Sequence, residues 1–409
     1  MNTEETKRSF NQEKSQLFNR SLVLDLIRQQ GICSRVTLSQ LSGLKQTTIT
    51  NIINEFIGYD LVVETGLMSG SKGRRSIGLK LNDDQYKVIG VRMTRMSFYI
   101  CLFGLSGQIY GISQYTIPHN ERVEETIARI RTAIQIFLNK NSDCEIPAIA
   151  MAMPGPYRAD IDRLLFVTEL VGWQNYPIKE ALAKDLSIPV YIVNDANASA
   201  FAQLWYRSKK SEIKNMIYVL AGQGIGCGMI ADGKLVDGDG GIAGEFGHNT
   251  INFNGPKCEC GNHGCLEKYC SSLVFCENIK KRLQAGEQSV LTIDNLTGVK
   301  ISEAVQSRDT VAREEYIKVC AFLSIGIVNL INQFNPGLIV IGDELTQIAP
   351  DLLLSIVQKK IYECINPLVL NDLTIEINQL TESPCLLGAG AIAAQNAIAD
   401  LSKLMNQSK

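Results

Sequence analysis

The sequence predicts an α/β protein with two folded units, a small helical unit with a β-hairpin over residues 1–81 and a larger unit over residues 82–409. Three observations predict this. A chain of 409 residues is longer than one ordinary domain. Three amphipathic helical patterns and two strand patterns fill the first eighty residues. From about Tyr86 onward, strand-like and helix-like runs alternate, which indicates sheets covered by helices.

The composition is that of a globular protein, with 45% hydrophobic and 20% charged residues. The N-terminus is polar and lacks the apolar segment of a secretory signal, and no apolar run approaches the ~20 residues that cross a bilayer. We therefore expect a cytoplasmic protein without membrane contact. Residues 1–80 carry 11 Lys/Arg and 7 Asp/Glu, whereas the remainder carries 29 and 35. A basic arm on an acidic body is compatible with nucleic-acid binding by the arm.

The first unit begins with helical patterns separated by turn signals. Ser21–Gln30 predicts a helix that ends at Gly31, and a second helix follows near Arg35–Leu41 with Ser34 as its N-cap. After a tight turn, Gln46–Gly58 predicts a third helix. Its buried stripe consists of Ile49, Ile52, Ile53 and Phe56. Its other face carries no acid and consists of Gln46, Thr47, Thr48, Thr50, Asn51 and Asn54, side chains suited to hydrogen-bonding base edges in a major groove.

Two strand patterns complete this unit, Leu61–Glu64 and Ser76–Leu81, and the link between them is flexible and cationic. A basic loop of this kind is typical of a wing that contacts phosphates. The order of elements predicts a winged helix-turn-helix, and a small helical interaction module with a basic loop is the alternative. The predicted DNA-contacting residues are Arg35, Gln46, Thr47, Thr48, Thr50, Asn51, Lys72, Arg74 and Arg75.

The larger unit contains strand-like runs at Lys87–Met93, Tyr99–Gly104, Ala148–Met153, Val190–Val193, Met216–Leu220 and Leu338–Ile341, several of them followed by glycine-rich turns. Six motifs in order over residues 85–395 resemble those of the ROK family, which comprises repressors and sugar kinases. The motifs are Pro154-Gly155-Pro156, Gly172-Trp173, Asn194-Asp195-Ala196-Asn197-Ala198, the glycine-rich stretch Gly222–Gly228, Gly244-Glu245-Phe246-Gly247-His248 and the cysteine-rich stretch Cys258–Glu267. With the helix-turn-helix in front, the whole chain resembles the repressors of the xylose-repressor, NagC and Mlc type.

This resemblance implies a two-lobed, actin-like ATPase fold of the sugar-kinase kind with a sugar in the cleft between the lobes. Lobe 1 would span about 82–197 and include the C-terminal helix at about 388–409, and lobe 2 would span about 198–387. The resemblance also implies the residues that hold sugar hydroxyls, which are Asn194, Asp195, Glu245, His248 and Glu267. Carboxylates suit such a ligand because they accept hydrogen bonds from neighbouring hydroxyl pairs.

Two residues of these motifs also have ordinary structural interpretations. Asp195 taken alone fits a capping or turn residue at a helix start. Trp173 fits a loop that closes over a ligand, or core packing, equally well.

A zinc site is expected around Cys258-x-Cys260-x4-Cys265, with His248 ten residues upstream. Three thiolates on a short glycine-containing loop and one imidazole form the set of a closed, four-coordinate structural zinc site. The alternative is a set of ordinary loop thiols, but cysteines so close in a polar segment are seldom there for packing. The resemblance assigns the same four ligands. His263 lies inside the loop and is expected at the surface.

Phosphoryl transfer is not expected, and we assign no catalytic residue. Kinases of the family open the domain with an Asp-x-Gly-Gly-Thr turn whose backbone approaches the phosphates. The corresponding positions here hold Arg92, Thr94, Arg95 and Met96, and Gln223 stands where the family has Thr. Side chains in place of glycine block a close approach of phosphate, and the lost acid removes help in holding Mg²⁺.

The sequence thus predicts a sugar-responsive repressor of carbohydrate-utilisation genes, xylose genes among them, with structural zinc as its cofactor. We expect it to bind an operator with an inverted repeat as a homodimer or a dimer of dimers. Two alternatives remain. The chain could be an ATP-dependent sugar kinase with an appended DNA-binding domain, or its large domain could dock on a sugar-transport protein.

Overall fold

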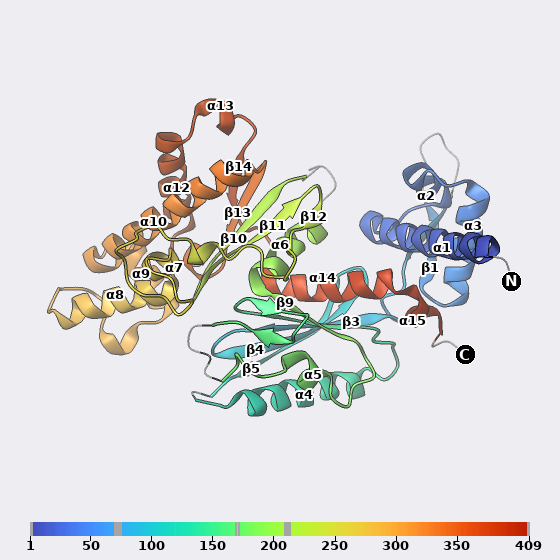
Figure 1. The fold of residues 1–409 in the computed structure, drawn as a ribbon, viewed down its shortest axis with the longest axis horizontal. Helices are drawn as coiled ribbons and strands as arrows, with labels where there is room; N and C mark the ends of the chain where they lie inside the picture. Colours follow the sequence, from blue (N-terminus) through green and yellow to red (C-terminus); the bar gives the residue numbers. More distant parts are fainter. Residues whose placement is uncertain are drawn as a thin grey trace.

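The computed structural model describes residues 3–68, 76–118, 120–167, 170, 172–207 and 214–406. A small N-terminal unit lies beside a larger body with two lobes (Figure 1). The small unit consists of α1 (Thr3–Gln30), α2 (Arg35–Ser42), α3 (Gln46–Gly58) and the antiparallel pair β1 (Val62–Met68) and β2 (Ser76–Leu81).

The helix-turn-helix agrees with its sequence pattern, except at the start of α1. The Ser34 hydroxyl accepts a hydrogen bond of 3.1 Å from the Thr37 amide and caps α2, and Gly43 ends that helix with φ of +71°. All four predicted core residues of α3 are buried. The prediction that the first helix begins at Ser21 was wrong, because α1 already begins at Thr3. No proline or glycine precedes Gly31, so a polar first half of the helix continues without interruption.

Each lobe is built on a five-stranded sheet, and the two sheets share one pattern. The first has the order β5-β4-β3-β6-β9 and the second β12-β11-β10-β13-β14. In both, the first three strands are antiparallel and the last two continue in parallel. The strands are β3 (Lys87–Met93), β4 (Ser97–Gly104), β5 (Ile109–Thr116), β6 (Ile149–Met153), β9 (Val190–Asn194), β10 (Met216–Ala221), β11 (Ile225–Ala231), β12 (Lys234–Leu235), β13 (Leu338–Gly342) and β14 (Thr374–Ile377).

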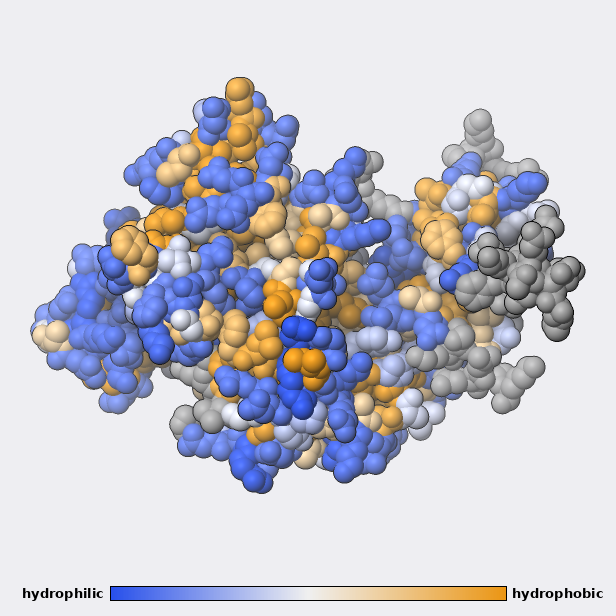
Figure 2. Space-filling model, in the orientation of Figure 1, coloured by the Kyte–Doolittle hydropathy of each residue, from blue (hydrophilic) through white to orange (hydrophobic). Residues whose placement is uncertain are grey.

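The remaining elements cover these sheets. The first lobe adds α4 (Val123–Lys140), α5 (Ile178–Ala183) and the hairpin of β7 (Tyr157–Arg158) with β8 (Arg163–Leu164). The second adds the 3-10 turns η1 (Phe246–His248) and η2 (Ile293–Asn295) and the helices α7 (Glu267–Cys270), α8 (Ser272–Gln284), α9 (Gly298–Gln306), α10 (Thr310–Phe334), α11 (Glu344–Ile348), α12 (Pro350–Cys364) and α13 (Pro367–Leu370). Exposed apolar side chains lie over α12 and α13, among them Tyr362 and Leu368 (Figure 2).

Helix α6 (Asp195–Tyr206) and helix α14 (Pro384–Ala399) cross at the centre of the molecule, and α15 (Leu401–Asn406) ends the described chain (Figure 1). Helix α6 contacts strands of both sheets, and α14 packs on α6 and β3. A Cβ at Gly388 would collide with the Ala198 carbonyl oxygen, which explains a glycine in the interior of α14. The two helices therefore touch backbone to backbone.

One apolar core joins the small unit to the first lobe. It contains Leu24 and Phe56 of the small unit, Phe103 of β4 and Leu401 of α15. The Tyr86 hydroxyl at the junction donates a 2.8 Å hydrogen bond to the Tyr59 carbonyl. The small unit is thus packed on the large one.

Helix α10 is long and apolar enough to cross a membrane by length and composition. It packs against α7, α8, α9 and α12, and it supplies Val319, Leu323 and Ile327 to the core of the second lobe. Core packing accounts for its apolar composition.

Candidate functional site

The site begins where β9 ends and α6 starts. Asn194 is the N-cap of α6, and its side-chain oxygen accepts hydrogen bonds from the amides of Ala196 (2.9 Å) and Asn197 (3.2 Å). Its side-chain amide donates to the Gly155 carbonyl at 3.2 Å. The capping role that the sequence left open for Asp195 is therefore carried out by Asn194. Asp195, the first residue of α6, lines a cavity between the lobes.

All five predicted sugar-contacting residues line this one cavity, whose volume is about 60 Å³. Asn194 and Asp195 come from the β9–α6 junction, Glu245 and His248 from the η1 turn, and Glu267 from the start of α7. The remaining wall consists of Arg95, Pro154, Gly155, Pro156, Phe166, Val167, Leu220, Gly224, Ile225, Gly226 and Gly244. Residues separated by 73 positions in the chain thus meet in one place.

Three carboxylates share the cavity, and their burial has a measurable consequence. Burial, together with repulsion from the nearby Asp343, raises the pKa of Asp195 to about 6, against the opposing effect of Arg92 and Arg95. Burial, together with repulsion from Asp195 and Glu267, raises the pKa of Glu245 to about 7.

Glu267 differs from the other two carboxylates, because it accepts a 2.9 Å hydrogen bond from the Ile225 amide and is anchored to β11. The cavity therefore presents three carboxylates that are at least partly buried.

The four predicted metal ligands also come together. The ligand atoms of His248, Cys258, Cys260 and Cys265 all lie within 4.8 Å of one another. The sulfurs of Cys260 and Cys265 are 3.6 Å apart, and Cys258 Sγ lies 3.5 Å from His248 Nδ1. Tetrahedral zinc with Zn–S of ~2.3 Å and Zn–N of ~2.0 Å requires separations of roughly 3.5–3.8 Å. The residues present fit a zinc ion.

The two nitrogens of His248 face different neighbours. Nδ1 lies towards Cys258, whereas Nε2 lies 3.9 Å from a carboxylate oxygen of Glu245 at the cavity. Phe166 packs edge-on against the ring, with centroids 4.8 Å apart. One imidazole thus serves the metal cluster with one nitrogen and the cavity with the other. His263, which lies between Cys260 and Cys265, is exposed, as its place in the sequence predicted.

Arg95 is the main residue of the cavity that sequence reasoning placed elsewhere. Its position in the turn after β3 indicated only a block to phosphate, yet its side chain reaches the cavity and lowers the pKa of Asp195. Phe166 was not predicted at all, since no motif contains it. Trp173, which the sequence left open between a closing loop and the core, is 2% exposed and belongs to the core of the first lobe.

On the other side of Asp195, Arg92 bridges the lobes, and Gln223 is held within the second lobe. Arg92 of β3 donates to the Ser383 hydroxyl at 2.7 Å and pairs with Asp343, just after β13, at 3.2 Å. Gln223 donates to Glu344 at 3.0 Å, and the same carboxylate accepts from Ser272 at 2.5 Å. Arg92, Asp343 and Ser383 line a second cavity of about 360 Å³.

The predicted nucleic-acid face lies on α3. Gln46, Thr47, Thr50 and Asn51 are exposed and Thr48 is half-buried, while Thr50 also bonds back to the Gln46 carbonyl at 2.8 Å. Arg35 pairs with Glu64 of β1 at 3.0 Å. The predicted wing residues Lys72, Arg74 and Arg75 lie outside the described residues.

Comparison with known proteins gives consistent relatives. The ROK family pattern matches residues 88–396. The chain is 30% identical over 390 residues to the xylose repressor of Caldicellulosiruptor bescii, covering 93% of this chain and 96% of that protein. It is 29% identical over 351 residues to the DNA-binding transcriptional dual regulator NagC of Escherichia coli, covering 85% and 84%.

Two solved structures extend the comparison to the fold. A ROK family transcriptional regulator, a homolog of the E. coli MLC protein, superposes with a TM-score of 0.80 at 27% identity over 96% of this chain and 99% of that chain. A ROK family glucokinase from Streptomyces griseus, in complex with glucose and AMPPNP, superposes with a TM-score of 0.65 at 24% identity. That match covers 76% of this chain and 99% of the glucokinase. The fold predicted from the sequence, an actin-like two-lobed body behind a helical N-terminal unit, is thereby confirmed.

Proposed function

The chain belongs to the ROK family, and we propose that it is a sugar-responsive transcriptional repressor of carbohydrate-utilisation genes. The observation that carries this proposal is where the relatives align. The three regulators match between 85% and 96% of this chain, whereas the glucokinase matches 76% although almost all of its own chain is covered. The additional part of this chain is of the size of the small N-terminal unit, which a DNA-binding protein needs and a kinase does not.

In this proposal, residues 1–81 form the winged helix-turn-helix and residues 82–409 the sugar-binding domain. Helix α3 enters the major groove with its exposed Gln, Thr and Asn side chains, which can read base edges. Arg35, Lys72, Arg74 and Arg75 contact phosphates and add affinity that depends on salt. The lobes divide at α6, with α14 and α15 returning to the first lobe.

The sugar is proposed to bind among Asn194, Asp195, Glu245, His248 and Glu267. Carboxylates are strong acceptors for hydroxyl groups, and Glu245 and Glu267 can each bridge neighbouring hydroxyls. A cavity of about 60 Å³ is smaller than the roughly 300 Å³ of an ordinary small-molecule site. The lobes therefore open to admit the ligand, and ligand binding acts on their relative position.

Zinc is proposed to brace this site. A closed set of one imidazole and three thiolates leaves no coordination position for substrate, so the metal's role is structural. Its ligand His248 lies three residues after Glu245, and its ligand Cys265 lies two residues before Glu267. The loop that holds the metal consequently fixes the two carboxylates.

Loss of phosphoryl transfer is part of this proposal, and the contacts of Arg92 and Gln223 support it. The Arg92 guanidinium occupies a place at the cleft between Asp343 and Ser383, and Gln223 is held by Glu344. Positioning and charge stabilisation account for most of the rate in phosphoryl transfer, so a phosphate cradle filled by side chains is not expected to work.

The direct test measures operator binding with and without sugar. A duplex enriched from a random library by the purified protein would serve as the probe, with D-xylose, D-glucose and N-acetyl-D-glucosamine as candidate inducers. We expect one sugar to weaken operator binding by about 5- to 150-fold, the usual range of allosteric coupling. ATP consumption with each sugar is measured in parallel. Sugar-dependent turnover would favour the kinase alternative.

The proposal also includes assembly and location. A symmetric dimer in the cytoplasm would place two copies of α3 on the half-sites of an inverted repeat. Light scattering after size exclusion, together with footprinting of the enriched duplex, tests both the dimer and the symmetry. A monomer that protects a single half-site would contradict this part of the proposal.

A further inference from the structure

We propose that the response to sugar reaches the DNA-binding unit through α6, and that the stacked pair of Arg28 and Trp205 is the contact that transmits it. This inference rests on the proposed function. It assigns a positioning role to two residues that lie outside the sugar cavity, the metal cluster and the DNA face.

Helix α6 joins the two ends of this route. Asp195 begins the helix at the sugar cavity, and Trp205 lies in its last turn. Twelve residues at ~1.5 Å each give a rigid segment of roughly 18 Å. The helix touches β11 closely enough that a Cβ at Gly228 would collide with the Ala196 carbonyl oxygen. Because α6 also contacts β9 and β10, it is placed to move when the lobes move.

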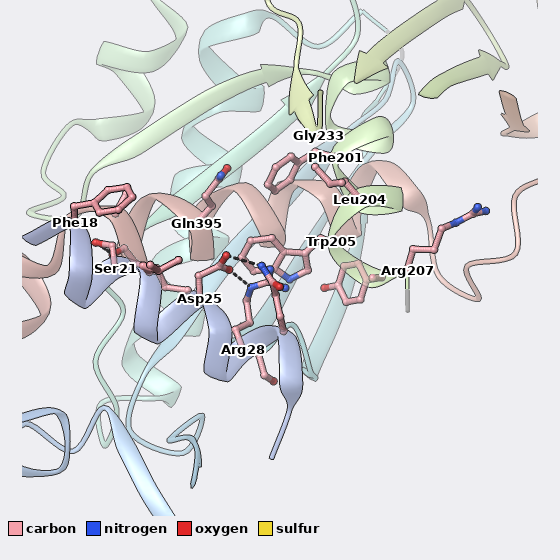
Figure 3. Close-up of a pocket in the computed structure, with 16 residues that line it drawn as sticks. Phe18, Ser21, Asp25, Arg28, Phe201, Leu204, Trp205, Arg207, Gly233 and Gln395 are labelled. Carbon is pink, nitrogen blue, oxygen red and sulfur yellow. Dashed lines mark hydrogen bonds and ion pairs between the residues drawn. The ribbon is translucent and has the colours of Figure 1, made fainter. Parts of the chain in front are cut away.

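At its far end, α6 meets the first helix of the DNA-binding unit. The Arg28 guanidinium of α1 stacks on the Trp205 ring, 3.5 Å from the ring centroid (Figure 3). Asp25 orients the guanidinium through a 2.8 Å ion pair, which Figure 3 draws as a dashed line. Trp205 is 9% exposed, and within the part of the chain that the structure describes its indole nitrogen has no hydrogen-bond partner. Packing and this stacking therefore hold the ring.

Within the small unit, α1 is fixed to the recognition helix. The Arg20 guanidinium donates two hydrogen bonds, of 2.9 and 3.0 Å, to the Glu55 carboxylate of α3. This bidentate pair restricts the orientation of α1 relative to α3. Leu24 and Ile27 of α1 share a core with Ile53 and Phe56 of α3. A shift of α1 is consequently a shift of α3.

The stacked pair lies at the edge of a pocket of about 780 Å³ between α1, α6 and α14 (Figure 3). Phe18, Leu22, Phe201 and Leu204 line it, and the Ser21 hydroxyl donates to the Ile398 carbonyl of α14 at 3.1 Å. A tightly packed junction would resist displacement, whereas this space allows α1 to shift against α6.

The test separates transmission from a merely structural role. Trp205→Leu and Arg28→Met remove the stacking and retain apolar bulk. For each variant, operator affinity is measured with and without saturating D-xylose, or N-acetyl-D-glucosamine if that sugar is the one that acts on the wild type. Sugar affinity is measured by calorimetry without DNA. We expect sugar affinity to stay within about twofold of the wild type and the sugar-induced ratio of operator affinities to fall below about threefold, from a wild-type ratio of about 5 to 150.

Two controls fix the interpretation. Tyr206→Phe removes the 3.0 Å hydrogen bond from the next residue of α6 to the Gly107 carbonyl but leaves the stacking intact, so its ratio should equal that of the wild type. Trp205→Phe keeps an aromatic face for Arg28 and should restore most of the ratio. A structural role would weaken operator binding equally with and without sugar and leave the ratio unchanged, and that result would overturn the proposal.

A second measurement uses the intact contact. The chain has two tryptophans, and Trp173→Phe leaves Trp205 as the single reporter. Sugar should then shift its emission and change its quenching by acrylamide. Saturation by sugar without any change would refute the proposal even if the Leu and Met variants failed to fold. If no sugar changes the operator affinity of the wild type, the proposed function itself is refuted. If the wild type responds and the variants respond equally, only the proposed route of transmission is refuted.

Discussion

Replacing Asp195 by Asn is expected to make the sugar-free protein more stable and to make it unresponsive to sugar. The pKa of Asp195 is raised from 3.8 to about 6, chiefly by burial, so ionisation of this carboxylate at pH 7 lowers the free energy of unfolding. At pH 7 the cost is about 3 kcal/mol, since one pKa unit corresponds to about 1.4 kcal/mol. The amide is neutral and removes this cost. Its oxygen can still accept from the Ala196 amide, which the Asn194 cap also satisfies at 2.9 Å.

The pH dependence has a definite sign. Because the folded-state pKa lies above the unfolded-state value, the penalty is fully present above pH 6, shrinks as the pH falls through 6 and disappears below 3.8. The stability advantage of Asp195→Asn should fall from about 3 kcal/mol at pH 7 to roughly half of that at pH 5. Urea unfolding at the two pH values measures it. Asp232→Asn, an exposed carboxylate in a left-handed turn that Asn tolerates, is the matched control and should show neither effect.

The same variant should lose sugar affinity while it keeps the operator. A hydrogen bond to a charged acceptor contributes about 1.5–3 kcal/mol, which is roughly ten- to a hundredfold in affinity. Calorimetry with the inducing sugar and anisotropy with the operator duplex give the two numbers. Two results would refute this reasoning. The variant could unfold at lower urea than the wild type at pH 7, or it could bind sugar and release DNA normally.

Three further predictions concern the metal, the DNA face and the central helix crossing. Cys260→Ala should lose the metal, lower the melting temperature and weaken sugar binding, and elemental analysis that finds no zinc in a sugar-binding wild type would contradict the brace. Asn51→Ala should make the protein less selective among base sequences. Arg74→Ala should instead weaken binding to all sequences and reduce the slope of log affinity against log salt concentration by about one. An unchanged slope would contradict the prediction that the loop of Arg74 is a wing that contacts phosphates. Gly388→Ala should lower the free energy of unfolding, measured by urea denaturation, by more than about 1 kcal/mol, because its methyl group would collide with the Ala198 carbonyl. A variant as stable as the wild type would show that α14 can move away from α6 at little energetic cost.

Sequence reasoning succeeded where the information is local. The stripe of Ile49, Ile52, Ile53 and Phe56 predicted α3 to the residue, because a helix repeats its buried face within its own length. The metal cluster was predictable because three of its four residues lie within one short stretch of the sequence. Periodicity does not show where a polar helix starts, and the early start of α1 was missed.

Contacts between distant segments were not predictable in this way. From the sequence, Arg95 was interpreted only as a side chain in place of a family glycine. Whether that side chain enters the cavity depends on the geometry of the turn after β3, which the sequence does not show. The pairing of Arg92 with Asp343 joins residues 251 positions apart, and the stacking of Arg28 on Trp205 joins the small N-terminal unit to α6. Neither pair has a sequence signature, since each depends on how the lobes and the small unit are assembled.

The position of the three carboxylates explains how a sugar could act on the lobes at all. In the proposed brace the loop of the metal cluster fixes Glu245 and Glu267, whereas Asp195 belongs to α6. A ligand that bonds to all three would then draw α6 and that loop together. Three charge-assisted hydrogen bonds could contribute roughly 4–9 kcal/mol before the costs of ordering are subtracted. An allosteric coupling needs only about 1–3 kcal/mol of this. The site can therefore bind its ligand and still shift the equilibrium of α6. A sugar that reached only Glu245 and Glu267 would bind to the loop without moving the helix, and it should compete with the inducer while leaving operator affinity unchanged.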